Sequence, residues 1–406
     1  MNKTTLTIVI AIVAIAIIAT AAFVLMNGNG GSDESKTCTV TFDSNGGSSV
    51  PSQTVKSGEH VTEPVSTWDG HTLNGWFTSA SGGSGFDFSE AVTKSVTLYA
   101  QWTDNIKPIK TKGDFMAILD DADGYYRLMN DISLGTLPES LSIDFNGTLD
   151  GNGHEISYDF TGTASWTKYY EGNTRNVYSY GLFEGLGSDA VIRDLKVNVD
   201  VLITVPLISA QIDAGPIAST AFGGSITGCT VNGTFYLKSK LSDDCSIVVG
   251  GLVGTVERQT LTVKDCTVNA SLAVNAASVD MGGAVGETFS TLDLDKFKMN
   301  GEVIGLGGAY VDSSGDYAKS RVMAGGVVGK SDGLSTVNNA IVSTNDVKVI
   351  RTSHVEDEIT HENSDPEYYI KSIGNESVTV IGGTNVDLSG NLGPYDEKYK
   401  GIDWNS

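Results

Sequence analysis

Gly228-Cys-Thr-Val-Asn232 recurs later in the chain as Asp265-Cys-Thr-Val-Asn269, and two further stretches, Asp194-Leu-Lys-Val-Asn198 and Lys296-Phe-Lys-Met-Asn300, follow the same pattern. In each stretch the second and fourth residues are apolar, which places them on one face of a β-strand. Aligned, they form two columns: Leu195, Cys229, Cys266 and Phe297, and Val197, Val231, Val268 and Met299. Such columns are typical of parallel strands in stacked repeats that bury their core against neighbouring units. The sequence therefore predicts an elongated solenoid.

An asparagine closes each of these stretches, at Asn198, Asn232, Asn269 and Asn300. Asparagine tolerates the left-handed αL conformation and can hydrogen-bond to an identical side chain stacked on it. We therefore expect a structural asparagine ladder that also supplies the turn. Asn232 and Asn269, together with Asn146 and Asn375, also begin formal N-glycosylation acceptors. An asparagine stacked inward cannot carry a glycan, so the two interpretations compete at Asn232 and Asn269.

Glycine-bounded blocks recur at intervals of 34, 36, 32 and 43 residues. They are Gly181-Leu-Phe-Glu184, Gly215-Pro-Ile-Ala218, Gly251-Leu-Val-Gly254, Gly283-Ala-Val-Gly286 and Gly326-Val-Val-Gly329. Glycines at fixed positions allow tight corners where one strand turns into the next. A phosphate-binding loop is excluded because no block is followed by the Lys-Ser/Thr pair that such a loop requires. In this alignment Glu184 and Ala218 replace the closing glycine.

The composition suits short strands and tight turns: the chain has 406 residues, with 48 Gly, 8 Pro and 18% charged residues. The formal net charge is −23, which makes nucleic acid an unsuitable partner. The acidic residues are spread along the chain, as expected for a soluble exposed surface.

The N-terminus carries an apolar run from Leu6 to Met26, close to the ~20 residues that span a hydrocarbon core as a helix. We predict a signal anchor or transmembrane helix over residues 1–26 and a flexible linker over 27–36. Lys3 precedes the run, whereas Asp33 and Glu34 follow it, so the charge bias places the N-terminus inside and the body outside the cell. Cleavage near Ala21 would release a secreted protein instead.

Residues 37–104 form the next predicted domain. Val40-Thr-Phe-Asp-Ser-Asn-Gly-Gly47, Gly75-Trp-Phe77 and Thr97-Leu-Tyr-Ala-Gln-Trp102 resemble, in this order, the blocks of the Listeria-Bacteroides repeat, an internalin B-repeat type of module in prokaryotic surface proteins. The resemblance implies a small β-grasp-like extracellular domain that serves as a spacer or interaction module and has no catalytic residues. Trp76, Phe77 and Trp102 would be core aromatics, and a ligand-stacking role is the alternative.

Residues 105–406 form the predicted solenoid. Apolar spacing over Asp114–Leu119 predicts a short capping helix at its start. Gly147-Thr-Leu-Asp-Gly-Asn-Gly-His-Glu-Ile156, followed by the Gly-Leu-Phe and Gly-Leu-Val-Gly blocks, resembles the right-handed β-helix proteins that carry GLUG motifs. The repeats cover about 181–349, and a C-terminal cap follows. The predicted fold class is all-β: an N-terminal transmembrane helix, a small β-grasp-like domain and a right-handed parallel β-helix.

Metal and cofactor sites find little support in the sequence. Asp120-Asp-Ala-Asp-Gly124 has carboxylates but not the spacing of an EF-hand loop, so a turn is expected. The densest group of possible ligands is His354, Glu356, Asp357, Glu358, His361 and Glu362. This group lacks the His-Glu-x-x-His pattern, and we interpret it as a solvated loop. The four cysteines, Cys38, Cys229, Cys245 and Cys266, are interpreted as small buried hydrophobes. We therefore assign no metal and no cofactor.

An enzyme on a β-helix would need paired carboxylates in a cleft. Asp293 and Asp295 are the obvious pair, because residues two apart on a strand face one side. Lys296, Lys298 and Arg193 are the residues expected to counter their charge. Other repeats lack carboxylates at comparable positions, and the chain lacks the aromatic density of sugar subsites. We therefore predict no enzyme and assign no catalytic residue.

These observations predict a membrane-anchored, adhesin-like cell-surface protein whose rigid β-helix binds a glycan, a cell or an envelope protein. Many weak contacts along the stack would add when several copies engage. A polysaccharide lyase or glycoside hydrolase on the same scaffold is the first alternative. A passive stalk or structural component of the envelope is the second.

Overall fold

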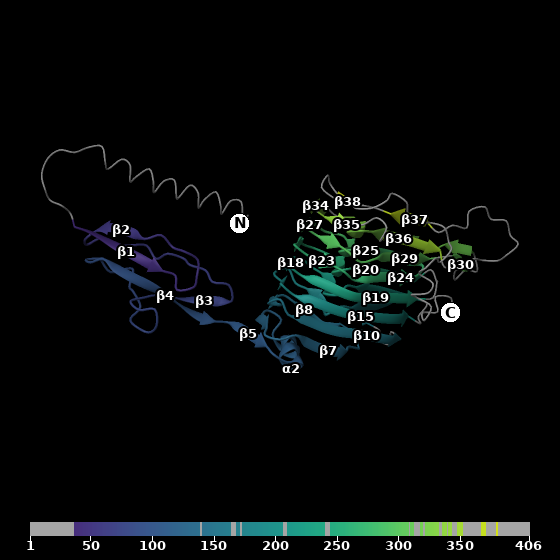
Figure 1. Ribbon diagram of the computed structural model, residues 1–406, viewed down its shortest axis with the longest axis horizontal. Helices are drawn as coiled ribbons and strands as arrows, with labels where there is room; N and C mark the ends of the chain where they lie inside the picture. The colour runs from purple at the N-terminus through teal and green to yellow at the C-terminus, as the bar shows by residue number, and fades with distance from the viewer. Residues whose placement is uncertain are drawn as a thin grey trace. The chain divides into compact units, whose positions relative to one another are not determined.

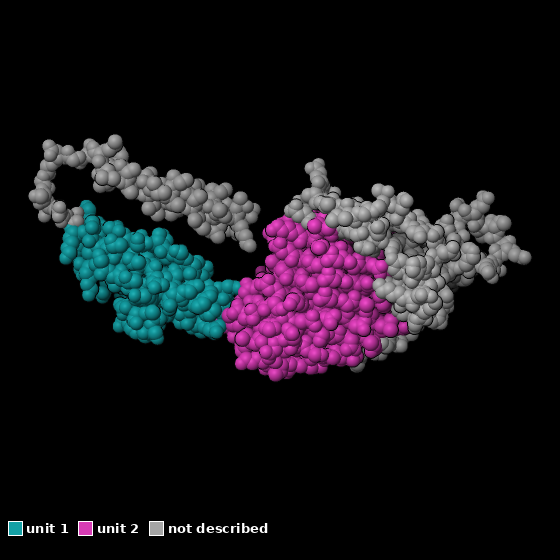
Figure 2. Space-filling view, viewed as in Figure 1, with its two compact units in different colours: residues 1–104 teal, residues 105–406 magenta. Residues whose placement is uncertain are grey.

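The computed structural model describes residues 36–138, 140–163, 168–170, 173–205, 209–239, 244–307, 309–311, 317–319, 321–332, 335–338, 340–342, 347–351, 367–370 and 379–380. The chain divides into two compact units, residues 1–104 and 105–406 (Figures 1 and 2). The predicted membrane helix at 1–26 and all but the last residue of the linker at 27–36 lie outside the described residues. Across the described ranges, no helix has the length and apolar character needed to cross a membrane.

The first unit is a four-stranded mixed sheet in the order β2-β1-β4-β3. Its strands are β1 (Thr37–Asp43), β2 (Gln53–Lys56), β3 (His71–Phe77) and β4 (Val96–Asp104). The central pair β1 and β4 is parallel, whereas β1–β2 and β3–β4 are antiparallel. Between residues 36 and 104 the structure contains no helix. The sheet therefore buries its inner face against the loops that connect its strands.

Alternation along β1 fixes the inner face of this sheet: Cys38, Val40 and Phe42 are buried. Trp76 is only 2% exposed and meets Phe42 edge to face, with ring centroids 4.9 Å apart. The prediction that Trp76 is a core residue is confirmed. Phe77 and Trp102 are only half-buried: Trp102 packs at the margin of the core, whereas Phe77 follows Trp76 on β3 and points to the other face of the sheet. The turn after β1 has positive φ at Asn45 (46°) and Gly46 (107°), as its Asn-Gly sequence predicts.

In the second unit the coils of chain contribute strands to four sheets, here named sheets I to IV, and between residues 148 and 370 the described strands visit them in a fixed order. Sheet I contains β7 (Ile132–Thr136), β10 (Glu155–Thr163), β15 (Lys196–Val205), β19 (Thr230–Ser239), β23 (Thr267–Val268), β24 (Ser271–Asn275), β28 (Lys298–Met299), β29 (Val303–Gly307), β35 (Ile341–Val342), β36 (Val347–Arg351) and β38 (Thr379–Val380). Sheet II contains β11 (Lys168–Tyr170), β12 (Asn173–Tyr180), β16 (Ser209–Ala214), β20 (Asp244–Gly250), β25 (Ser278–Gly282), β32 (Arg321–Gly325) and β37 (Glu367–Ile370).

Sheet III contains β8 (Leu141–Phe145), β13 (Phe183–Leu186), β17 (Ala218–Ala221), β21 (Val253–Val256), β26 (Val285–Thr288) and β33 (Val328–Ser331). Sheet IV contains β5 (Ile106–Ile109), β6 (Tyr125–Leu128), β9 (Thr148–Asp150), β14 (Val191–Arg193), β18 (Gly224–Thr227), β22 (Leu261–Lys264), β27 (Leu292–Asp295) and β34 (Ser335–Asn338). A separate hairpin pairs β30 (Ala309–Val311) with β31 (Tyr317–Lys319). Among the described strands of the four sheets, every pair except β11–β12 is parallel. Successive coils therefore stack as in a β-helix (Figure 1).

The predicted core columns are confirmed by the strand register. Val197 lies opposite Val231, Val231 opposite Val268 and Val268 opposite Met299. Leu195, Cys229, Cys266 and Phe297 form the second column, and all eight side chains are at most 2% exposed. They belong to one continuous core that runs from the first coil to Ala340. Each coil thus buries its apolar face against the coils on either side of it.

The asparagine ladder is present, but its side chains point outward and it does not supply the αL turn. Asn269 Nδ2 donates to Asn232 Oδ1, and Asn300 Nδ2 donates to Asn269 Oδ1, each over 2.8 Å. Asn198 lies in register with Asn232. The prediction of an inward asparagine in the αL conformation was wrong, because the turn comes before the strand. Positive φ occurs at its first residue in each unit: Asp194, Gly228, Asp265 and Lys296.

The glycine blocks form the corners between sheets II and III, as predicted from their spacing. A Cβ on Gly251 would lie 2.0 Å from the carbonyl oxygen of Gly283, so only glycine fits. One aligned block has to be shifted. Ala218 pairs with Val253, so Ser219, and not Ala218, stands where Gly254 closes the motif. Gly215 accordingly corresponds to Gly250, because Ala214 pairs with Val249.

The predicted capping helix is confirmed as α2 (Lys112–Met116), which continues into the 3₁₀ helix η1 (Ala117–Asp120). Thr111 and Asp114 form a capping box that satisfies backbone N–H groups at the helix start. Phe115 and Ile118 are fully buried and close the first coil of the core. The helix therefore covers apolar surface that would otherwise face water.

We expect Thr111→Ala to destabilise this cap by about 1 kcal/mol, because the N-cap oxygen that accepts from Asp114 N is lost. Amide hydrogen exchange of the full-length chain should accelerate over residues 112–120 and stay unchanged in the sheets beyond the first coil. Thr111→Ser retains the hydroxyl and serves as the matched control. Equal exchange in the alanine variant and the wild type would contradict the capping role.

Candidate binding surface

The outer face of sheet I is formed by long strands, with 10 residues each in β15 and β19. Its strands β7, β10, β15, β19 and β24 lie side by side in Figure 1. Along β15 burial alternates strictly from Lys196 to Val205, so every second side chain points to the outer face. The outward residues of β10 and β15 are mainly hydroxyl, amide and carboxylate groups. This polar face is rigid because its inner side is part of the core.

A groove of about 320 Å³ lies on this face across β7, β10 and β15. It is lined by Ser133, Gly135, Ser157, Tyr158, Asp159, Thr161, Asn198, Val199 and Asp200. Tyr158 and Val199 turn their side chains into the core, so the groove presents the others. The resulting surface offers hydroxyl and amide donors beside carboxylate acceptors.

A β-bulge creates space for the groove. The pairing of β7 with β10 shifts between Ser157 and Tyr158, so that Ser133 pairs with Ser157 and Gly135 with Tyr158. Gly135 has φ 68°, and a Cβ placed on it would have no neighbour within 4 Å. The missing side chain leaves the edge of β7 open beside Asp159. Bulges often redirect side chains next to functional sites.

Two carboxylates and an apolar margin complete this surface. Asp159 pairs in register with Asp200, and the Thr234 hydroxyl on the next coil donates to Asp200 Oδ1. Two residues further along the strands, Leu202 lies in register with Tyr236. Leu202 is 44% exposed although it is a large aliphatic residue. A polar groove thus adjoins a small apolar patch on the same face.

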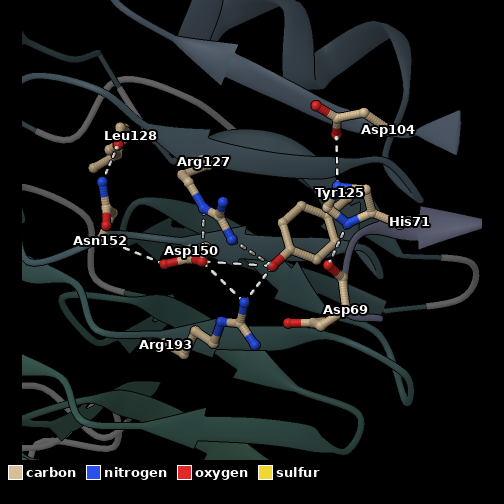
Figure 3. A network of polar contacts seen from close by, with 9 residues as sticks. All are labelled: Asp69, His71, Asp104, Tyr125, Arg127, Leu128, Asp150, Asn152 and Arg193. Carbon is tan, nitrogen blue, oxygen red and sulfur yellow. Dashed lines mark hydrogen bonds and ion pairs between the residues drawn. The ribbon is translucent and has the colours of Figure 1, made fainter. Parts of the chain in front are cut away.

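A second polar constellation lies on the outer face of sheet IV (Figure 3). Arg127 Nε and Arg193 Nη2 donate to the same Asp150 oxygen, Oδ2, over 3.0 and 2.9 Å. Both guanidinium groups lie over the Tyr125 ring, 5.8 and 5.6 Å from its centroid, and both donate to its hydroxyl. The backbone N–H of Asn152 donates to Asp150 Oδ1 over 2.9 Å. Strands β6, β9 and β14 of three successive coils are joined in this way.

The environment of Asp150 holds it in the charged form. Burial alone would raise the pKa of Asp150, but hydrogen bonds from Arg193, the Asn152 backbone and Arg127 outweigh burial and lower it. Its carboxylate is nearly covered, whereas about a third of each arginine side chain reaches solvent. Because every oxygen of Asp150 has a donor, this cluster is best understood as a clamp between coils.

In the first unit, Figure 3 shows His71 beside the Asp104 carboxylate, with 3.9 Å between Nε2 and Oδ1. His71 Nδ1 lies 2.9 Å from the carbonyl oxygen of Asp69. The Trp68 ring stacks on the imidazole with centroids 3.9 Å apart, and Gly46 lies against the indole. Trp68 is therefore fixed by contacts within its own unit, and no sequence pattern predicted this stack.

Buried carboxyl groups occur where sheets II and III meet. Asp213 on β16 accepts from Thr255 Oγ1 over 3.0 Å, and burial raises its pKa to about 7. Burial also raises the pKa of Glu287, opposed by its ion pair with Lys330. Lys330 Nζ lies 3.0 Å from Asp332 Oδ2 as well. Asp213 and Glu287 were not singled out from the sequence, because each has its partner in a different coil.

Asp293 and Asp295, the pair proposed for catalysis, lie on β27 in sheet IV and share its outer face, as predicted. Asp293 has Thr262 and Thr336 as its register neighbours, whereas Asp295 has Lys264 and Asn338. They are partly exposed, and the groove on sheet I does not include them. The structure therefore places this pair on a flat strand surface away from the groove.

The basic residues expected beside this pair are placed differently. Arg193 is three coils away from Asp295 in the register, through Thr227 and Lys264, and it binds Asp150. Lys296 pairs with Asp265 over 3.5 Å, and Lys298 lies opposite Thr267 on sheet I. The prediction that Arg193 compensates the charge of Asp293 and Asp295 was wrong. Arg193 and Asp295 occupy equivalent positions in different coils, so the coils between them keep them apart.

The other residues singled out from the sequence are the possible metal ligands and the cysteines. Within the described ranges, no group of three or more His, Cys, Asp or Glu side chains is placed to hold a metal. The segment Asp120–Gly124 contains a turn at residues 122–123, and Asp121 just before it forms an ion pair with Lys107. The group His354–Glu362 lies outside the described residues, as do Asn375 and most of the predicted C-terminal cap. All four cysteines are buried and free, as predicted.

One known family and several relatives match parts of this chain. Residues 39–101 match the Listeria-Bacteroides repeat domain. A protein of Evansella cellulosilytica named as a Gly-rich membrane protein is 31% identical over 111 residues, which is 27% of this chain and 13% of that protein. A second membrane protein of the same organism is 36% identical over 69 residues, covering 16% of this chain and 10% of the relative.

Internalin H of Listeria monocytogenes is 38% identical over 73 residues, or 17% of this chain and 13% of internalin H. The chain thus spans about a tenth of the length of each of these relatives. Two of these relatives are named as membrane proteins and the third as an internalin, and none of the names states an enzymatic activity. The predicted resemblance of the first domain to the Listeria-Bacteroides repeat is confirmed by the matched residues.

Proposed function

We propose that this chain is an adhesin-like cell-surface protein that binds glycans in the groove on the outer face of sheet I. The observation that carries the proposal is the groove of about 320 Å³ with Ser133, Ser157, Thr161 and Asn198 among its lining residues. Hydroxyl and amide groups can donate to and accept from sugar hydroxyls. The names of the relatives support placement at a membrane or cell surface.

In this proposal the parts of the chain have distinct roles. The apolar run at Leu6–Met26 anchors the protein with its body outside the cell, and the Listeria-Bacteroides repeat acts as a spacer. The stacked coils form a right-handed β-helix of the type with GLUG motifs. Because the stack is rigid, little conformational entropy is lost when a ligand binds to its surface.

The apolar margin favours a sugar over a purely polar ligand. A sugar ring has both hydroxyl edges and C–H faces, and the surface offers a polar groove beside Leu202 and Tyr236. A tyrosine ring can contact the C–H face while its hydroxyl remains hydrated. One site of this kind binds weakly, and many copies on one cell would add their contributions through multivalency.

We predict that Asn198→Ala weakens glycan binding by the full-length chain roughly tenfold, because about one hydrogen bond from the groove is lost. Binding of the purified protein to a glycan array, followed by titration with the best ligand, measures the effect. Thr262→Ala, which truncates an outward residue on sheet IV, is the matched control. No saturable binding on the array would contradict the proposal and favour a passive stalk.

A further inference from the structure

Every charged residue that lines the groove on sheet I is acidic. Asp159 and Asp200 are the two, and their strands pair in register. Neighbouring strands lie about 4.8 Å apart, so the two carboxylates point outward side by side. Like charges placed directly opposite each other destabilise a sheet. The groove therefore has a negative potential. A cationic ligand would neutralise part of it, whereas an anionic ligand would add to it.

In their described residues, the groove-forming strands β7, β10 and β15 carry no cationic side chain directly beside these carboxylates. The nearest lysine on the outer face of β15 is Lys196, four residues before Asp200, which corresponds to about 13 Å along a strand. Thr234 is a neutral donor to Asp200 and fixes the position of its carboxylate. The whole chain carries a formal charge of −23, so the field of the protein adds to that of the groove.

We propose that Asp159 and Asp200 determine the specificity of the groove, selecting glycans that carry amines and rejecting those that carry carboxylates. This inference rests on the proposed glycan-binding function and names its ligand class. An ammonium group of an aminosugar can donate hydrogen bonds to both carboxylates while the sugar hydroxyls meet Ser157, Thr161 and Asn198. A uronic acid would bring a third negative charge to the same place.

The test uses three matched ligands, the β-1,4-linked hexamers of glucosamine, glucose and glucuronic acid. They share one backbone and differ in charge. Titrations of the purified full-length chain at about pH 6, where amines are protonated and carboxyls are ionised, give the affinity for each. We expect the order glucosamine, glucose, glucuronic acid, with each step on the order of tenfold. Added salt should compress the differences, because both carboxylates are near solvent.

The double variant Asp159→Asn and Asp200→Asn should bind the three hexamers with nearly equal affinity. Both side chains keep their size and their ability to hydrogen-bond, so a charge effect is separated from a packing effect. Asp293→Asn removes one charge from sheet IV and should retain the wild-type order. Circular dichroism of each variant verifies that the sheets are intact.

The outcomes separate this inference from the proposed function. Equal binding of the three hexamers by the wild type, or an unchanged order in the double variant, overturns the charge selection while glycan binding stands. The charge selection is also overturned if Asp293→Asn reduces the differences between the three hexamers as much as the double variant does, because the effect would then come from net charge. Failure of wild type and double variant to bind any hexamer or any array glycan overturns both the inference and the proposed function.

Discussion

Gly283→Ala is expected to disrupt the stack at the corner between sheets II and III and to cost on the order of 3 kcal/mol or more. A Cβ at this position would lie 2.0 Å from the carbonyl oxygen of Gly326 and 3.2 Å from Cγ of Met299. Backbone of the next coil cannot rotate away as a long side chain can. The coils on either side must therefore separate, which breaks hydrogen bonds such as Gly283 N to Gly325 O.

Hydrogen exchange measured by mass spectrometry on the full-length chain checks this expectation. Exchange should accelerate around β25, β26, β32 and β33 and change less in coils near the N-terminal cap, because repeat stacks respond mainly at nearest neighbours. Gly113→Ala is the control: its Cβ would meet only the Thr111 hydroxyl at 3.6 Å, inside α2. That substitution should be neutral or slightly stabilising. Equal exchange profiles for the two variants would contradict the steric role of Gly283.

The repeat columns were predictable because a core column depends only on local alternation and on the repeat period. Val197, Val231 and Val268 are apolar at the same place in each unit, and they stack as that pattern requires. The cap helix was predictable for a similar reason, since Phe115 and Ile118 show helical spacing within one short segment. Patterns confined to a few adjacent residues thus translate directly into structure.

The groove was not predictable, because it depends on which strands become neighbours. Alternation along β10 and β15 does place Asp159 and Asp200 on the outside, and this signal is visible in the sequence. Their side-by-side position also requires the exact register, and the space beside them requires the bulge at Gly135. The clamp at Asp150 shows the same limit. Its two arginines come from different coils, and the sequence alone led us to assign Arg193 to Asp293 and Asp295 instead.

Asp213→Asn is expected to stabilise the protein at neutral and alkaline pH. Burial, together with the negative charges of Glu287 and Glu257, raises the pKa of Asp213 to about 7, although hydrogen bonds from Thr255 and Gln211 oppose this. An aspartate in the unfolded chain has a pKa near 3.9, so folding at high pH forces the carboxylate into an unfavourable site. Asparagine has a similar shape and remains neutral.

The direction of the pH effect follows from this difference in proton binding. Below about pH 4 both states of the wild type are protonated at Asp213, and the variant has little advantage. Between about pH 4 and pH 7 the unfolded state loses its proton first, so the wild type loses stability as pH rises. Above pH 7 the advantage of the variant levels off, at about 4 kcal/mol as an upper order of magnitude.

Urea unfolding followed by circular dichroism at a series of pH values measures the gap between Asp213→Asn and the wild type. Asp293→Asn, on the partly exposed face of β27, is the control and should run parallel to the wild type throughout. Asp213 lies in the wall between sheets II and III, so the gap reports on the core and not on the groove. A constant gap from pH 4 to pH 8 would show that Asp213 keeps an ordinary pKa and would contradict this prediction.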